Sequence, residues 1–477
     1  MTLTRRPTLP RAAGFKPLAL ALALGFAASA AQAQSLRELY EAARSYDATY
    51  LGARAQAESA QYRADQAGAL RLPTVGLQAS STYADTETSA ESKTMVKSSG
   101  AVVGGSSTST EAKGTTNQIA LSAQQNLFNR ANGITIEQAE RAVAVAQAQL
   151  RAAEQDLIVR LAQAYFDVLA ATDTLNTVQA SKKAISEQLA SAKRNFEVGT
   201  ATITDTREAQ ARYDLSVANE LAADNDLRVK RLALDQLVGR QNAAPKPLAL
   251  PVALPPVAPA NVEDWVTGAE ARSPAIQQAQ LGLEVARLET EKARAGHLPT
   301  LTLGANYVKS NPNGTSDTTA AGTPVTLTQS RNGNTTTASV NLTLNVPLFA
   351  GFAVQNRIKE TLSLEEKARN DLDGARRAVS QGTRQAFFGV QSLQAQVKAL
   401  EAAESSSKLA LEATQLGYKV GVRVNLDVLN AQTQLYTTQR DLAKARYDVI
   451  VNGLKLRQVS GQLQPEDLQA TDALLAP

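Results

Sequence analysis

The chain contains no cysteine, one histidine and one tryptophan among its 477 residues. Without cysteine it can form no disulfide, no thiolate nucleophile, no cysteine-ligated metal site and no lipid-modified cysteine. With one histidine and no Gly-x-Ser-x-Gly motif, the sequence offers neither a nucleophile–base pair nor a metal-binding cluster. We therefore expect no enzymatic activity, no metal and no cofactor.

Residues 1–33 have the pattern of a secretory signal peptide. Four basic residues between Arg5 and Lys16 precede the apolar stretch Leu18 to Phe26, and Ala31-Gln32-Ala33 is a small-x-small cleavage site. We expect the mature chain to begin at Gln34. After this leader no run of 18 apolar residues occurs, so no transmembrane helix is predicted, although a secreted chain can also cross a membrane as a β-barrel.

The mature chain has little net charge. The full sequence carries 49 basic and 45 acidic residues, and the leader holds four basic residues and no acidic ones. The mature chain is therefore formally neutral, which removes the electrostatic reason to expect nucleic acid as a partner.

The second half of the sequence repeats the first at a nearly constant offset, which indicates an internal duplication. Val198-Gly199, Asp205, Gln236 and Gly239 recur 222 positions later as Val420-Gly421, Asp427, Gln458 and Gly461. Leu72-Pro73 recurs as Leu298-Pro299 at an offset of 226, and Leu127-Phe128 as Leu348-Phe349 at 221. We predict a first structural repeat over residues 34–240, a linker over 241–260, a second repeat over 261–461 and a tail over 462–477. The linker is dense in proline between Pro245 and Pro259, which predicts an extended strap.

Each repeat carries two segments in which apolar and polar residues alternate, the pattern of a strand with one apolar face. These segments begin near Val75 and Ile119 in the first repeat and near Leu301 and Ala338 in the second. Between them lie Asp85 to Thr116 and Ser310 to Thr337, rich in Ser, Thr, Gly and Asn, which we interpret as long exposed loops. Asn311 to Gly314 is a turn signal within the second loop.

Each repeat also contains a very long helical segment. Ile134 to Glu197 has no proline or glycine over 64 residues, which predicts a rod of about 96 Å. The counterpart runs from about Ala353 to Lys419. Both contain steps of four and three residues between apolar positions, typical of a coiled-coil seam. The seam positions are Leu161, Tyr165, Val168, Thr172 and Leu175 in one copy and Ala386, Val390, Leu393, Val397 and Leu400 in the other.

A glycine ends each rod, and a shorter helix returns from it. The turns contain Gly199 and Gly421, and polar caps at Thr204-Asp205 and Asn425 to Asp427 are expected to start the return helices. These run over Thr204 to Val238 and Asn425 to Ser460. Opening helices over Leu36 to Leu70 and Val262 to Ala295 supply the remaining length, so two short helices stacked end to end would match one rod.

Four strands cannot close a membrane barrel, which needs at least about eight. An open sheet is not tolerated in lipid, so several chains must share one barrel. The helices would extend that barrel as a hollow cylinder, and a barrel joined to a tube is a conduit.

Several motifs resemble the TolC family of outer-membrane channels used in drug efflux and type I protein secretion. They are Gly296 to Thr300, Ala164-Tyr165-Phe166, Val198-Gly199 with Ile203 to Asp205, and Gly417 to Gly421 running into Asp427 to Leu429. The resemblance covers roughly Leu36 to Pro465. It implies a mixed α+β membrane protein, a homotrimer with a 12-stranded β-barrel and a 12-helix coiled-coil tunnel in the periplasm. The implied location is the cell outer membrane, and the implied partners are a periplasmic adaptor and an inner-membrane RND or ABC pump, which choose the substrate.

The resemblance also implies site residues at the tips of the helices. Tyr418 would pair with Asp205, and Arg423 with Thr204, in a periplasmic gate. Asp427 would form a ring of carboxylates at the pore constriction. Asn430 stands where a close relative has a second aspartate, so the expected negative charge of this ring is halved. The adaptor would dock on the tip residues Val198, Gly199, Thr200, Val420, Gly421 and Val422.

Simpler interpretations remain open for these residues. Asp205 and Asp427 lie in the first turn of a helix, where a carboxylate is favoured by the helix dipole alone. The two glycines would serve equally as helix stops, Trp265 as a packing residue and His297 as part of a helix–strand junction. A secreted trimeric coiled-coil adhesin or spacer is the alternative function, and conductance across a lipid bilayer separates it from a channel.

Overall fold

A computed structural model describes residues 34–249, 251–252 and 254–476. The predicted signal peptide and its cleavage site lie outside these residues. The chain divides into two units. The helical unit comprises the described residues of Met1–Arg54, Leu150–Pro274 and Arg376–Pro477, and the sheet unit comprises Ala55–Gln149 and Ala275–Ala375.

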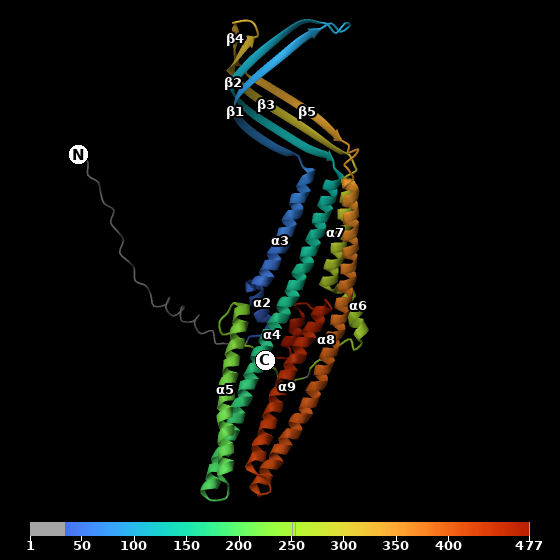
Figure 1. The fold of residues 1–477 in the computed structure, drawn as a ribbon. Coiled ribbons are helices and arrows are strands. Elements are labelled where there is room, and N and C mark those ends of the chain that lie inside the picture. Colours follow the sequence, from blue (N-terminus) through green and yellow to red (C-terminus); the bar gives the residue numbers. More distant parts are fainter. Residues whose placement is uncertain (1–33, 250, 253, 477) are drawn as a thin grey trace, which may run out of the picture. The chain divides into compact units, whose positions relative to one another are not determined.

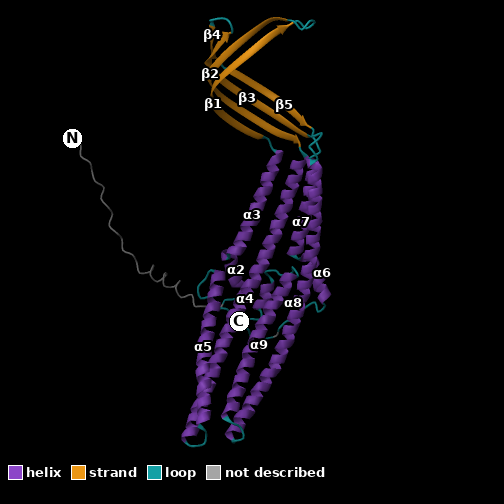
Figure 2. Cartoon of the chain, viewed as in Figure 1, coloured by secondary structure: helices purple, strands orange, loops and turns teal. Residues whose placement is uncertain are grey.

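Helices and strands follow the same general order in both halves of the chain, which the colours of Figure 1 trace from N- to C-terminus, and Figure 2 separates the helices from the strands by colour. The first half contains α2 (Leu36–Tyr46), α3 (Ala48–Gly68), the 3-10 turn η1 (Ala69–Arg71), β1 (Thr74–Met95), β2 (Val102–Phe128), α4 (Arg130–Glu197) and α5 (Ile203–Val238). The second contains α6 (Val262–Arg272), α7 (Pro274–Ala295), β3 (Thr300–Ala320), β4 (Thr326–Asn332), β5 (Thr335–Asn345), α8 (Ala353–Lys419), α9 (Asn425–Val459) and α10 (Asp467–Asp472).

The two predicted rods are confirmed as helices of 68 and 67 residues, α4 and α8. Their seam positions are buried or half-buried in the helical unit. On α4, Leu161 and Tyr165 are fully buried, and on α8, Val390 and Val397 are 3% and 4% exposed. Val397 packs with Leu442, Ala445 and Val449 of α9. Because a long helix in water is stabilised mainly by its packed apolar face, these contacts account for the rods.

The predicted opening helices are each broken once, which corrects the expectation of single helices. Asp47 separates α2 from α3, and Ser273 separates α6 from α7. Both residues have non-helical backbone angles and are buried, and they are equivalent positions at the offset of 226. The return helix ends against each break, because Gly239 lies against the ring of Tyr46 and Gly461 against the backbone of Arg272. The end-to-end stacking of two short helices is therefore confirmed.

The linker between the repeats has no helix among its described residues and is held by side chains of the helical unit. The Tyr165 hydroxyl accepts a hydrogen bond from the Lys246 amide at 2.8 Å. Trp265 is 4% exposed in a cluster with Phe387, Val390 and Leu456, and its indole N–H donates to the Pro259 carbonyl at 2.8 Å. Its interpretation as a packing residue is confirmed.

The strands of the sheet unit form one antiparallel sheet in the order β1-β2-β3, with β4 and β5 both paired to β3. β5 pairs with Thr300–Ser310 of β3 and β4 with Asn313–Thr319, so these two short strands occupy successive stretches of one edge. The sheet therefore has four strand positions, as the sequence predicts. Its two outer edges, along β1 and along β4 and β5, have no strand partner within the described chain.

The predicted loops Asp85 to Thr116 and Ser310 to Thr337 are wrong. β1 and β2 stay paired from Thr74 and Gln124 to Met95 and Val102, which leaves only a short turn between them. Asn311 to Gly314, predicted as a turn, pairs with Asn117 to Gly114 inside the sheet. An exposed antiparallel ladder satisfies its backbone without burying apolar side chains, and threonine favours strands, so polar composition does not exclude this structure.

The two faces of the sheet differ in chemistry. Pairing places Val75, Ala123, Ala305 and Val340 in one cross-strand row, and Leu77, Leu121 and Tyr307 in the next. These residues define the apolar face. The opposite, polar face bears Thr74, Gln124, Asn306 and Asn341. The apolar side chains are uncovered in the single chain, since Leu77 is 73% and Val340 76% exposed.

None of the described helices has the length and apolarity needed to span a membrane.

Candidate functional site

Two helix hairpins of the helical unit end in equivalent turns. Figure 1 shows the α4–α5 and α8–α9 ends side by side. Gly199 and Gly421 have φ angles of 80° and 83°, the left-handed region that glycine adopts without strain. The amide of Thr200 donates to the Asn195 carbonyl at 2.8 Å, and the amide of Val422 to the Gly417 carbonyl at 2.9 Å. This Schellman-type ending is repeated at the 222-residue offset, so the duplication extends to backbone hydrogen bonds.

Asp205 and Asp427 both cap the helices that start after these turns. Asp205 accepts a hydrogen bond from the Thr202 amide at 3.0 Å, and Thr202 accepts one from the Asp205 amide at 3.2 Å. The cap of α5 is therefore Thr202, whereas the sequence prediction placed it at Thr204. Asp427 accepts from the Val424 amide at 3.4 Å. The simpler interpretation of both aspartates as capping residues is confirmed.

The structure brings the predicted gate residues to one end of the helical unit but gives them other partners. The Tyr418 hydroxyl accepts a hydrogen bond from the Asn195 side chain at 3.1 Å, which joins the two hairpins. The Arg423 guanidinium lies 3.7 Å from the Asp427 carboxylate, one turn along its own chain. Within the described part of this chain, Tyr418 makes no hydrogen bond to Asp205, and Arg423 makes none to Thr204.

Asn425 is a functional candidate for which sequence reasoning gave only a capping role. It is 2% exposed, accepts a hydrogen bond from Gln188 of α4 and donates to the Asp205 carbonyl at 3.4 Å. A buried amide with partners on both hairpins fixes how they pack. The available signal was the repeat itself, since Asn425 stands where the first copy has apolar Ile203.

Asn430, predicted at the constriction, accepts a hydrogen bond from Arg212 of α5 at 3.0 Å. Arg212 was not among the predicted residues. It also lines a groove between α4, α5 and α9 with Ser181, Tyr436 and Arg440. Burial and the charge of Glu187 raise the pKa of Tyr436, so its phenol stays neutral at physiological pH.

An apolar cluster supports the hairpin ends, and the turns themselves are exposed. Ile185, Leu189, Ala192, Ala209 and Leu429 are buried together, with Tyr213 packed against them. In contrast, Val198, Val420 and Val422 are 73%, 66% and 75% exposed. Valine side chains exposed to water on these hydrogen-bonded turns leave an apolar surface available to a partner. Among the described residues no group of three or more acidic or histidine side chains is arranged to hold a metal.

Comparisons with known proteins agree with this arrangement. A family model described as outer membrane efflux protein matches the chain twice, over residues 39–240 and 265–462. Outer membrane protein TolC of Escherichia coli (strain K12) is 31% identical over 464 residues, covering 96% of this chain and 89% of that protein. Alkaline protease secretion protein AprF of Pseudomonas aeruginosa is 32% identical over 355 residues, covering 74% and 71%.

A solved structure shows the same fold. The outer membrane protein VceC from Vibrio cholerae has a TM-score of 0.68 and 20% identity, covering 89% of this chain and 96% of that one. With long helices, an antiparallel sheet and two matches to the family model, the chain belongs to the outer membrane efflux protein family, and it is a TolC-like efflux or type I secretion channel of the outer membrane with a periplasmic helical extension.

Proposed function

We propose that three copies of this chain close one barrel of 12 strands and that their helices form one periplasmic tunnel. The observation that carries the proposal is the sheet: four strand positions, two unpaired edges and an uncovered apolar face. In lipid, each unpaired backbone group costs several kcal/mol, about 4–8 by transfer to hydrocarbon, so both edges require partners.

Strand direction supports closure between chains. β1 and β3 run one way and β2 and β5 the other, since every pair in the sheet is antiparallel. The β1 edge of one chain therefore meets the β5 edge of the next as another antiparallel pair. Repeating this junction three times closes the barrel with its apolar faces outward, as a membrane barrel requires.

The partners follow from the same proposal. A periplasmic adaptor binds the exposed tip residues Val198, Gly199, Thr200, Val420, Gly421 and Val422, and an inner-membrane RND or ABC pump supplies the substrate. The exposed valines support an apolar docking contact. The name of the relative AprF, a protease secretion protein, supports secreted protein as one class of cargo. Residues 34–240 and 261–461 act as two equivalent repeats of one wall.

The hairpin ends form the periplasmic gate. Tyr418 holds the two hairpins of one chain together, and Arg423 reaches the neighbouring chain near Thr204 and Asp205. The pair Arg423–Asp427 is exposed, at 61% and 37%, and such pairs contribute only about 0.2–1 kcal/mol. Arg423 therefore exchanges this partner for one across the interface at little cost. Asp427 narrows the pore, with Asn430 held beside it by Arg212.

Engineered cysteines test the shared barrel directly, because the native chain contains none. Ser80→Cys in β1 combined with Ser339→Cys in β5 places two thiols on the polar face. Within a chain they lie three strand spacings apart across the sheet and four residues apart along it, about 20 Å in all. A short bifunctional maleimide should join them only between chains. Placing the β1 cysteine in turn at Gln78, Ser80 and Thr82 samples the possible registers between β1 of one chain and β5 of the next. Gln118→Cys in the interior strand β2 with Ser339→Cys is the matched control. Products of two and three chains on a denaturing gel support the proposal, and products confined to the monomer overturn it.

A further inference from the structure

The charged residues of the sheet are distributed unevenly between its faces. The five strands contain nine charged residues, and pairing assigns eight of them to the apolar face. These eight are Asp85, Glu87, Glu91, Lys93, Glu111, Lys113, Lys309 and Asp317. Arg331 is the ninth. Arg331 of β4, Gly314 of β3, Gly114 of β2 and Ala84 of β1 form one cross-strand row. All four lie on the polar face of the sheet.

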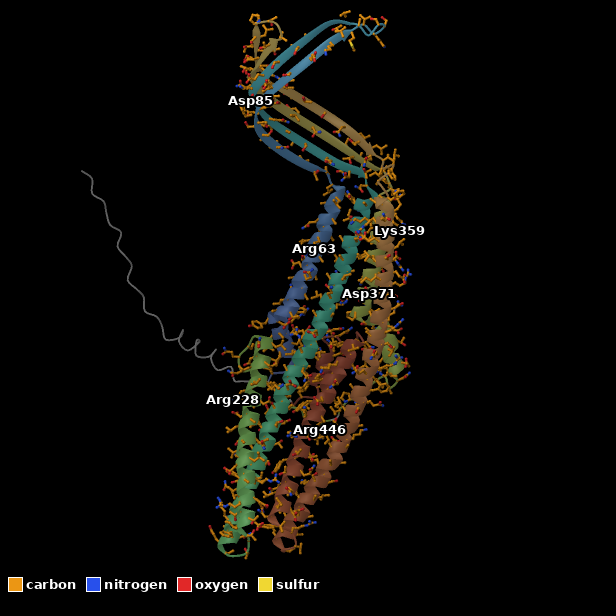
Figure 3. All side chains as sticks on the ribbon, in the orientation of Figure 1. Arg63, Asp85, Arg228, Lys359, Asp371 and Arg446 are labelled. Carbon is orange, nitrogen blue, oxygen red and sulfur yellow. The ribbon has the colours of Figure 1, made fainter. Side chains whose placement is uncertain are left out.

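The apolar rows of the sheet lie near the strand ends that join the helices. The row that contains Arg331 lies farther along the strands, away from the helices. Asp85, labelled in Figure 3, is the neighbour of Ala84 and marks the place where the strands bend. The other three residues of the row are glycine or alanine, so no bulky side chain crosses the face beside Arg331. A Cβ on Gly314 would lie 2.7 Å from the Cα of Gly114, which shows how closely the two backbones approach here.

In the part of the chain that the structure describes, no carboxylate neutralises the charge of Arg331. Among the described residues it makes no ion pair, since every acidic residue of the sheet lies on the opposite face. A neighbouring chain would add its own β1 to this edge, and β1 has only uncharged residues on its polar face.

We propose that Arg331 from three chains forms a ring of positive charge inside the outer mouth of the channel and binds multivalent oxyanions there. This inference rests on the proposed trimeric barrel, whose polar face lines the pore. A single-sign ring in a confined passage focuses its field and raises the local concentration of counter-ions. The ring gives the outer mouth a charge opposite to that of Asp427 at the gate.

Tripolyphosphate added to the extracellular side of single channels in a planar bilayer is the probe. In about 0.1 M KCl the parent should be blocked, and the block should weaken in 1 M KCl because salt screens the ring. Arg331→Gln should raise the half-blocking concentration roughly tenfold. Arg331→Lys should retain the block, and Arg331→Glu should abolish it. Lys309→Gln, which removes a cation from the opposite face of the same sheet, should leave the block unchanged.

The outcomes separate this inference from the proposed function. A parent that forms no channel contradicts the trimeric barrel. A conducting Arg331→Gln channel that tripolyphosphate blocks as it blocks the parent overturns the Arg331 ring alone. If Lys309→Gln raises the half-blocking concentration as much as Arg331→Gln does, the Arg331 ring is also overturned. The block would then depend on positive charge on either face of the sheet.

Discussion

At the scale of the residue, the sequence placed the proposed gate residues together but did not predict their contacts. Tyr418, Arg423, Asp205 and Asp427 lie at the hairpin ends as the resemblance implied, and the partners they make within one chain differ. Asn195 and Asn425 make hydrogen bonds between the hairpins, as Arg212 does with Asn430, and neither Asn195 nor Asn425 belongs to a motif. Their importance arises from which helices meet, and a pattern along one chain does not specify that.

Removing the proposed latch should open the channel. Tyr418→Phe deletes the hydroxyl that accepts from Asn195, and Arg423→Ser deletes the guanidinium beside Asp427. A hydrogen bond of this kind contributes about 0.5–3 kcal/mol, and three chains lose it together. The double variant should show a several-fold higher single-channel conductance while remaining an oligomer. Arg440→Ser, which removes an exposed arginine paired with Asp441, is the control and should conduct like the parent. Parental conductance in the double variant would show that these residues are not the latch.

A partly buried ion pair of the helical unit should make stability depend on pH. Asp47, 8% exposed at the break between α2 and α3, accepts two hydrogen bonds from Arg160 at 3.0 Å. These bonds hold the pKa of Asp47 below its ordinary value, although burial opposes them. The stabilisation is therefore complete above the unfolded pKa of about 4 and is lost as pH falls through the lower folded pKa.

The variant Asp47→Asn tests this dependence. It should lower the free energy of unfolding near pH 7 by about 1–2 kcal/mol, because Arg160 is partly solvated. Thermal unfolding followed by helical circular dichroism should show the difference shrinking towards acid pH. Asp156→Asn removes the other, more exposed partner of Arg160 and should have a smaller effect. A difference that is independent of pH would rule out the ion pair as its cause.

At the scale of the element, periodicity predicted long helices and strand starts well, and composition predicted loops badly. The rods α4 and α8 follow from apolar steps of three and four residues. The break at Ser273 had a signal, because Pro274 disfavours the α conformation before it, whereas Asp47 has no such neighbour. The outer halves of β1, β2 and β3 have no apolar buried face. Their order comes from pairing with a neighbouring strand, so the sequence there shows no alternation of apolar and polar residues.

The close approach of β2 and β3 should depend on glycine. Gly314→Ala introduces a Cβ that meets the backbone of Gly114 at 2.7 Å, so the strands must separate. Overpacking of this kind costs about 1–3 kcal/mol, and heat-induced dissociation of the assembly on a denaturing gel should occur at lower temperature. Gly104→Ala adds a Cβ with no atom within 4 Å and should leave dissociation unchanged. Equal behaviour of the two variants would contradict the close packing.

The β1–β2 turn should face the outside of the cell. It consists of residues 96–101 and connects strands whose other ends join the helices. An epitope tag inserted after Lys97 should therefore be labelled by antibody on intact cells without loss of assembly. Lys97 lies within Asp85 to Thr116, the segment that the sequence analysis interpreted as an exposed loop. If the tag is labelled only after the outer membrane has been permeabilised, this end of the sheet faces the periplasm and the prediction is contradicted.

At the scale of the whole molecule, duplication and incomplete closure together explain the function. Two repeats each supply two strand positions, one rod and one return helix, and the family model matches each repeat in turn. The alternative of a secreted adhesin or spacer is wrong, since the family is one of efflux and secretion channels. A sheet with two unpaired edges requires strands from other copies of the chain to close a barrel. No residue pattern in one chain states how many copies take part, and the number three is implied by the family resemblance.

The subunit number is therefore the most direct test of the account. Native mass spectrometry of the protein purified in mild detergent measures it, after the subunit mass has been determined under denaturing conditions. We expect the subunit mass of a chain that begins at Gln34 and an intact assembly of three such masses. A protein that retains channel activity as a monomer, or as any assembly other than a trimer, would contradict the shared 12-stranded barrel.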